Sequence, residues 1–168
     1  NLALHFPKER WNDLERNIIS AAKEFSYNDI QKFIEHIISS PFTREHVEIL
    51  AAHLTTSETY FWREPQTFEA LEQLIIPELI RHHQKREKRI RIWSAGCSTG
   101  EEPYSIAIAL NRTIPNIKDW NISILATDIN PRVLQKAMAG EYGQWSFRGT
   151  PQWLKEEYFL KKPNNKFE

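Results

Sequence analysis

A change of pattern near residue 89 constrains the fold of this 168-residue chain more than any other feature. Residues 90–93 predict a short strand that runs into a loop containing glycine, and helical spacing follows in residues 103–110. Residues 121–127 alternate as a second strand that ends at Asp128, and residues 131–139 again show helical spacing. This order predicts the first part of a doubly wound, Rossmann-like α/β fold with a parallel sheet.

The first part of the chain shows helical periodicity. Apolar residues recur at helical spacing in three segments, which predicts three helices packed on a common core: residues 11–22, 30–38 and 47–54. Ser26, with Asp29 three residues later, predicts the start of the second helix as a variant of the capping box. Thr43 is a candidate cap for the third helix.

The boundary between the two patterns defines two expected domains. We expect a helical subdomain at residues 1–56 and an α/β part at residues 57–168, which begins with a helix after Pro65 that Pro77 kinks or splits. Two parallel strands do not make a stable open sheet with covered faces. The sheet is therefore expected to be incomplete, and the chain to be a fragment of a longer protein.

Composition excludes several classes of protein. The chain has 22 Lys and Arg against 22 Asp and Glu, so no global field draws it to nucleic acid or to a membrane surface. Its longest apolar runs are far too short to cross a bilayer. The single cysteine, Cys97, excludes a disulfide framework and indicates a reducing cytoplasm, and the histidines lack metal-ligand spacing. We expect a cytoplasmic protein without a metal.

One local charge cluster leaves an alternative open. Residues 81–91 hold six basic side chains against Glu87. Such a cluster attracts an acidic partner or, less readily, nucleic acid, but it is also typical of a solvated helix end.

The loop after the first strand restricts the class of ligand. Gly96 and Gly100 let the backbone turn sharply and approach a ligand at the carboxyl end of the strand. A phosphate-binding loop needs Lys-Ser/Thr where this chain has Glu101-Glu102, and the three-glycine dinucleotide fingerprint is incomplete. S-adenosylmethionine (SAM) has no phosphate and carries a sulfonium and an ammonium group, so its charge suits the acidic loop.

Each acid also has a purely structural interpretation. Asp128 is placed to accept hydrogen bonds from ribose hydroxyls, but it is equally a candidate cap for the helix at 131–139. Glu101 and Glu102 favour a helix N-terminus through the macrodipole even without a ligand.

Four stretches resemble the chemotaxis receptor methyltransferases, the CheR family. Residues 93–105 (WSAGCSTGEEPYS) are similar to the first motif of this family, and residues 126–130 (ATDIN) to its second-strand motif. Residues 56–64 (TSETYFWRE) resemble the segment that follows its N-terminal helical domain. The pattern continues in Tyr142, Trp145, Ser146 and Arg148, so the resemblance covers nearly the whole chain.

The resemblance implies an activity and a set of cofactor contacts. Such enzymes transfer a methyl group from SAM to the side-chain carboxylate of glutamates in chemoreceptor-type proteins, which gives glutamyl methyl esters and S-adenosylhomocysteine. It implies a SAM methyltransferase domain whose C-terminal half lies elsewhere in the same or another chain. Besides the two glycines, the expected cofactor-binding residues are Ser57, Thr59, Arg63, Glu101 and Asp128.

No catalytic proton-transfer residue is expected, because a glutamate carboxylate, with a pKa of about 4.3, is already ionised near pH 7. The expected partner is a chemoreceptor or a related signalling protein. The alternative is a non-catalytic SAM-binding sensor or scaffold module.

Overall fold

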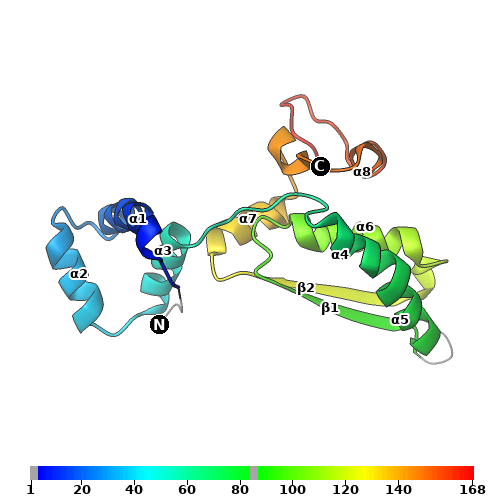
Figure 1. Ribbon diagram of the computed structural model, residues 1–168, viewed down its shortest axis with the longest axis horizontal. Helices are drawn as coiled ribbons and strands as arrows, with labels where there is room; N and C mark the ends of the chain where they lie inside the picture. Colours follow the sequence, from blue (N-terminus) through cyan, green and yellow to red (C-terminus); the bar gives the residue numbers. More distant parts are fainter. Residues whose placement is uncertain (1–3, 84–86) are drawn as a thin grey trace. The chain divides into compact units, whose positions relative to one another are not determined.

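The computed structural model describes residues 4–83 and 87–168, which form two compact units (Figure 1). One unit comprises the described residues up to Thr56 together with Ile129–Arg132. The other comprises Ser57–Asp128 and Val133–Glu168. Within these described ranges, no helix combines the length and the hydropathy needed to cross a bilayer.

The first unit is built from three helices, as the periodicity predicts. A short 3₁₀ turn, η1 (Lys8–Arg10), leads into α1 (Trp11–Glu24), which is followed by α2 (Ile30–Ser39) and α3 (Arg44–Leu54). Their apolar faces meet in a core that contains Ala21, Phe33 and Leu50. The Thr43 hydroxyl accepts a hydrogen bond from the His46 amide (3.2 Å), which confirms the predicted cap of α3.

The predicted start of the second helix at Ser26 is wrong. Ser26 adopts a left-handed conformation (φ 61°) and closes α1, because its amide donates to Lys23 O and the Tyr27 amide donates to Ala22 O. Asp29 is the cap of α2, and its carboxylate accepts from the Gln31 amide at 2.9 Å. The serine therefore ends one helix instead of starting the next.

The helix after Pro65 changes its hydrogen-bond pattern before Pro77. It begins as α4 (Pro65–Ala70), passes through a π-helical turn, η2 (Leu71–Ile75), and continues as α5 (Ile76–His83). A proline inside a helix lacks an amide donor and its ring crowds the carbonyl of the preceding turn. The wider turn lies where this crowding is expected, so the predicted interruption is present without a break in the helical path.

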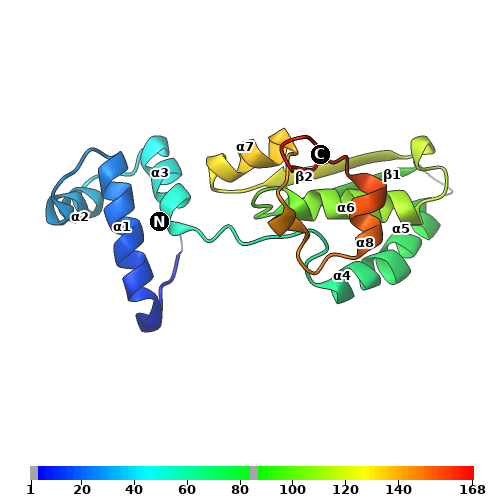
Figure 2. The same ribbon diagram turned by 90° about the horizontal axis from the view of Figure 1, so that it is seen from above.

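Two parallel strands form the sheet of the second unit. Strands β1 (Arg89–Ala95) and β2 (Asn121–Thr127) pair in register along their whole length, with Ile92 beside Ile124. Helix α6 (Glu101–Thr113) and a 3₁₀ turn, η3 (Ile117–Asp119), connect the strands. Helices α4, α5 and α6 lie over one face of the sheet (Figures 1 and 2).

The two faces of this sheet differ in burial. Ile90 points to the helices and is 3% exposed, whereas Trp93 and Leu125 point the other way and are 68% and 61% exposed. The observed fold is thus a mixed helical structure with a two-stranded parallel sheet covered on one face by the described residues.

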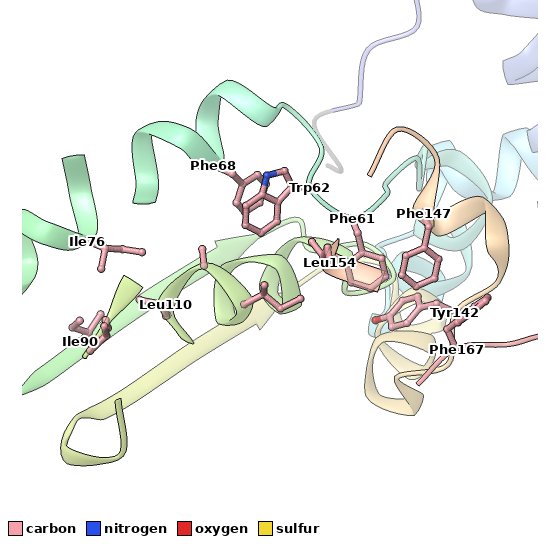
Figure 3. Close-up of a cluster of buried hydrophobic side chains, with 13 residues drawn as sticks. Phe61, Trp62, Phe68, Ile76, Ile90, Leu110, Tyr142, Phe147, Leu154 and Phe167 are labelled. Atoms are coloured by element: carbon pink, nitrogen blue, oxygen red, sulfur yellow. The ribbon is translucent and has the colours of Figure 1, made fainter. Parts of the chain in front are cut away.

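The C-terminal residues fold back onto the start of the same unit. After α7 (Pro131–Ala139) the chain forms a 3₁₀ turn, η4 (Gln144–Phe147), and α8 (Gln152–Tyr158), neither of which the sequence pattern predicted. Phe61 is fully buried and stacks on Phe147, with ring centroids 4.9 Å apart, and Tyr142 meets it edge-on (Figure 3). This aromatic cluster joins residues that are far apart in sequence.

Part of the basic stretch lies outside the described residues, namely Lys85 and Arg86. Several of its remaining cations pair with acids: Arg81 with Glu78, Lys88 with Asp119 and Arg89 with Glu87. Local pairing therefore offsets part of the charge that suggested an acidic partner.

Candidate functional site

The glycine-containing loop between β1 and α6 is tied to the end of β2. The amides of Gly96 and Cys97 both donate to Thr127 O, at 2.8 and 2.9 Å. Gly96 and Ser98 have positive φ angles of 75° and 49°, which produce the sharp turn. A Cβ built on Gly96 would meet nothing within 4 Å, so the space in front of this residue is open.

Gly100 has a different environment. It also has a positive φ, 97°, but a Cβ there would lie 2.8 Å from both the Ala137 Cβ and the Tyr142 hydroxyl. Glycine is therefore required at position 100 by close packing inside the protein, and at position 96 by the turn alone. The expected approach of a ligand to the loop is sterically open at Gly96.

Asp128 lies at the end of β2 and holds the loop. Its Oδ2 accepts a hydrogen bond of 2.8 Å from the Ser98 amide. The capping position before α7 is taken by Asn130, whose Oδ1 accepts from the Arg132 amide at 3.0 Å. The helix cap is thus Asn130, and the contact of Asp128 with a ribose stays a prediction.

The adjacent acids Glu101 and Glu102 have separate roles. Glu101 is 2% exposed, and its Oε2 accepts from the Thr99 hydroxyl at 2.6 Å. Glu102 is exposed and accepts from the buried Ser94 hydroxyl, also at 2.6 Å. Only Glu101 is therefore a carboxylate enclosed beside the loop.

The charge of Glu101 is incompletely compensated. Within residues 4–83 and 87–168, no Lys or Arg side chain pairs with its carboxylate. Its position at the start of α6 stabilises it by about 0.3–1 kcal/mol through the helix dipole, up to about 2 kcal/mol when partly buried. Enclosing an ion in a protein costs several kcal/mol, so a cationic partner would be favourable here.

The segment 57–63 contacts the loop through Ser57. The Ser98 hydroxyl donates to Ser57 O at 3.2 Å, which places Ser57 beside the loop. Thr59 O accepts from Arg148 Nη1 at 3.1 Å, and Arg63 Nη1 donates to Glu58 O at 2.9 Å. Ser57 and Asp128 thus both contact the loop that contains Gly96 and leads into Glu101. Thr59 instead contacts Arg148, and Arg63 contacts its own segment.

Two residues that connect these parts were not predicted as site residues. The Ser105 hydroxyl is fully buried, donates to Glu101 O (2.7 Å) and accepts from the Trp62 amide (3.0 Å). The Tyr142 hydroxyl donates to Thr99 O at 2.9 Å. Both residues lie in the stretches that carry the family resemblance, but only the tertiary contacts show what they hold.

Burial raises the pKa of two groups near the loop. Desolvation, followed by the charge of Glu101, raises the pKa of Tyr142 far above its ordinary value, so its hydroxyl stays a donor. Desolvation, with Asp128 and Glu102 as further causes, also raises the pKa of the Cys97 thiol. Cys97 is therefore a buried, neutral thiol.

The charged groups around the loop fit a cationic ligand that lacks phosphate. The start of α6 and the end of β2 contribute the carboxylates of Glu101 and Asp128, and residues 94–102 contain no Lys or Arg. The ammonium and ribose of SAM match these acceptors, whereas a triphosphate would be repelled. Because space is open at Gly96, the residues present fit this cofactor.

Comparison with known proteins shows the family of the chain. Residues 57–168 match the family model "CheR methyltransferase, SAM binding domain". The chain is 37% identical over 145 residues to a "Probable chemotaxis protein methyltransferase" of Rhizobium etli, covering 79% of this chain and 53% of that protein. It is 32% identical over 170 residues to a "Chemotaxis protein methyltransferase" of Borreliella burgdorferi, covering 100% of this chain and 60% of the relative.

These matches confirm the resemblance found in the sequence and identify SAM as the cofactor of the matched domain. The chain spans only 53% and 60% of the length of these two relatives.

Proposed function

The chain belongs to the CheR methyltransferase family, and on this premise we propose that it is part of a SAM-dependent protein-glutamate O-methyltransferase acting on chemoreceptors or related signalling proteins. The family match and the enclosed carboxylate of Glu101 beside an open glycine turn support this proposal. The burial of Glu101 is the observation that carries the proposal. A buried carboxylate with no cation beside it in the described residues is stabilised when the bound ligand supplies a cationic group.

We propose that residues 1–56 form the N-terminal subdomain and residues 57–168 the first part of a Rossmann-like domain. The remaining strands would come from a C-terminal half in the same or another chain. The exposure of Trp93 (68%) and Leu125 (61%) supports a further part of the domain, because both faces of a parallel sheet are normally covered by the helices that connect its strands.

The proposed residue roles follow from charge and position. Glu101 would hold the ammonium group and Asp128 the ribose hydroxyls, while the planar guanidinium of Arg63 suits an acidic group of the ligand. Ser57 and Thr59 would add polar contacts from the neighbouring segment, and Gly96 leaves room for close approach.

The chemistry requires little acid–base assistance from the protein. SAM, when bound, supplies an activated methyl group. The acceptor glutamate is ionised near pH 7, so the chain's own residues need only bind, orient and exclude water, and none is assigned a proton-transfer role.

The proposal is tested by exchanging one acid at a time in the full-length protein. Glu101→Gln keeps the shape of the side chain but removes its charge, and we expect S-adenosylhomocysteine to bind about 10- to 100-fold more weakly by isothermal titration calorimetry. Glu102→Gln is the matched control, because its carboxylate contacts Ser94, and its affinity should stay unchanged. Equal effects of the two variants would contradict the assignment of Glu101.

Methyl transfer distinguishes the enzyme from the sensor. When the full-length protein is incubated with receptor peptides and SAM that carries a tritiated methyl group, the glutamates of the peptides should acquire a base-labile label. A full-length protein that binds the cofactor but transfers no label to any receptor peptide would favour the sensor or scaffold alternative.

A further inference from the structure

The segment that carries Ser57, Thr59 and Arg63 lacks regular secondary structure. The buried backbone N–H and C=O groups of the segment must therefore form hydrogen bonds with other parts of the protein. The Phe61 amide donates to Ser146 O at 2.8 Å, and the Thr150 hydroxyl donates to Phe61 O at 3.1 Å. Residues about 90 positions later in the chain thus fix the middle of the segment.

Arg148 makes the most extensive of these contacts. Its Nη1 donates to Thr59 O at 3.1 Å and to Trp145 O at 2.9 Å, and its Nη2 faces Glu58 Oε1 at 3.4 Å. Its guanidinium also lies over the ring of Tyr60, 4.4 Å from the centroid. One side chain therefore contacts three consecutive residues of the segment.

The environment of Arg148 is half-enclosed. Its side chain is 21% exposed, and the ring of Trp145 lies 4.7 Å from the guanidinium carbon. Arginine suits this position because its planar group donates in several directions and stacks on aromatic faces at the same time. Lysine keeps the charge but offers neither the fork nor the flat surface.

We propose that Arg148 is a positioning residue for the cofactor site: it fixes the backbone at residues 58–60 so that Ser57, Thr59 and Arg63 face the cofactor. This inference rests on the proposed function. Arg148 acts through the segment, because the contacts that define it are to Glu58, Thr59 and Tyr60.

The test is Arg148→Lys in the full-length protein, with S-adenosylhomocysteine as the probe in isothermal titration calorimetry. We expect binding to weaken about tenfold, as for the loss of one charge-assisted hydrogen bond. In a methyl-transfer assay the KM for SAM should rise while kcat stays within about twofold, because the lost contact orders the binding segment.

Arg112→Lys is the matched control. Arg112 also stacks on an aromatic ring, with its guanidinium carbon 3.7 Å from the Trp153 centroid, and pairs with Glu72 at 3.2 Å. Its loss should lower stability to urea without changing cofactor affinity. A merely structural Arg148 would give the same result as Arg112.

The outcomes separate the two proposals. Unchanged affinity in Arg148→Lys would overturn the positioning role alone, since the unaltered protein would still bind the probe. No binding by the unaltered protein would overturn the proposed function and this inference with it. Should Arg148→Lys fail to fold, Glu58→Gln removes only the 3.4 Å ion pair, and affinity should fall about twofold; no fall would contradict the inference.

Discussion

Two regions beside the candidate site reach their conformations in different ways. The loop from Gly96 to Gly100 turns because glycines permit positive φ angles, and the amides of Gly96, Cys97 and Ser98 donate to the adjacent strand end at Thr127 and Asp128. The segment 57–63 contains no glycine, and its bonds go to Ser98, Ser105 and residues 146–150.

The two regions should therefore respond to different substitutions. A loop encoded by its own residues is disturbed by changing those residues. A segment shaped by distant partners is disturbed by changing the partners, even when its own sequence is intact. Trp62 illustrates this, since its φ of 58° is unfavourable for a bulky residue and persists only where surrounding contacts impose it.

The largest expected effect is in the loop. Gly100→Ala adds a Cβ at 2.8 Å from Ala137 and Tyr142 in a left-handed conformation, so the free energy of unfolding should fall by about 2–4 kcal/mol. Urea-induced unfolding measures it. Gly96→Ala is the control, because it places a Cβ on a residue with positive φ but into open space. It should lower the free energy of unfolding by only about 1 kcal/mol.

The two glycine variants also distinguish an effect on packing from an effect on cofactor binding. Because the added methyl group of Gly96→Ala occupies open space in front of the loop, cofactor affinity should fall more than stability does. Similar stability losses for the two variants would show that crowding at position 100 is relieved by movement of Tyr142 or Ala137.

The next effect lies where the two regions meet. Ser105→Ala removes the partner of the Trp62 amide and should lower the free energy of unfolding by about 2 kcal/mol, because a buried donor loses its acceptor. Hydrogen exchange should show faster exchange of the Trp62 amide than in the unaltered protein. Exchange that stays unchanged would mean that another group holds the segment at this point.

A smaller effect concerns the contact of Tyr142 with the loop. Tyr142→Phe removes its hydrogen bond to Thr99 O and should cost about 1 kcal/mol at pH 7. The raised pKa of Tyr142 means that this contribution is fully present below about pH 10, the ordinary pKa of tyrosine, and is lost as pH rises toward the folded value.

Urea unfolding at pH 9 and pH 11 tests whether the stabilisation by Tyr142 falls as pH rises. The unaltered protein should lose about 1 kcal/mol more than Tyr142→Phe over this interval. Tyr104→Phe, whose more exposed hydroxyl donates to Ala137 O at 3.3 Å, is the control and should keep the alkaline loss. A Tyr142→Phe variant with the same alkaline loss would contradict the role of its buried phenol.

Regular elements with a clear period were predictable from the sequence. Residues 121–127 and 131–139 form a strand and a helix with the expected bounds, and the first strand runs into the glycine loop as predicted. Helix ends were less predictable, because a serine at residue 26 suits a cap in sequence yet adopts the left-handed closing position in space. Short elements such as η4 and α8 lack enough turns to show a period.

The candidate site, too, was predictable from the sequence only in part. Residue types, spacing and charge indicated an acidic loop and a ligand without phosphate, and the motifs indicated the family that the family model confirms. Charge and spacing alone did not distinguish Glu101 from Glu102, and only the family resemblance implied Glu101 as the cofactor contact. Burial separated them.

Where the chain can turn, and which charges it brings to the turn, follow from the sequence, because backbone freedom and side-chain charge are local properties. That Arg148, Ser105 and Tyr142 hold the neighbouring segment and loop follows from the three-dimensional contacts. Their partners lie 43 to 89 positions away in the chain, a distance over which no local pattern specifies a contact.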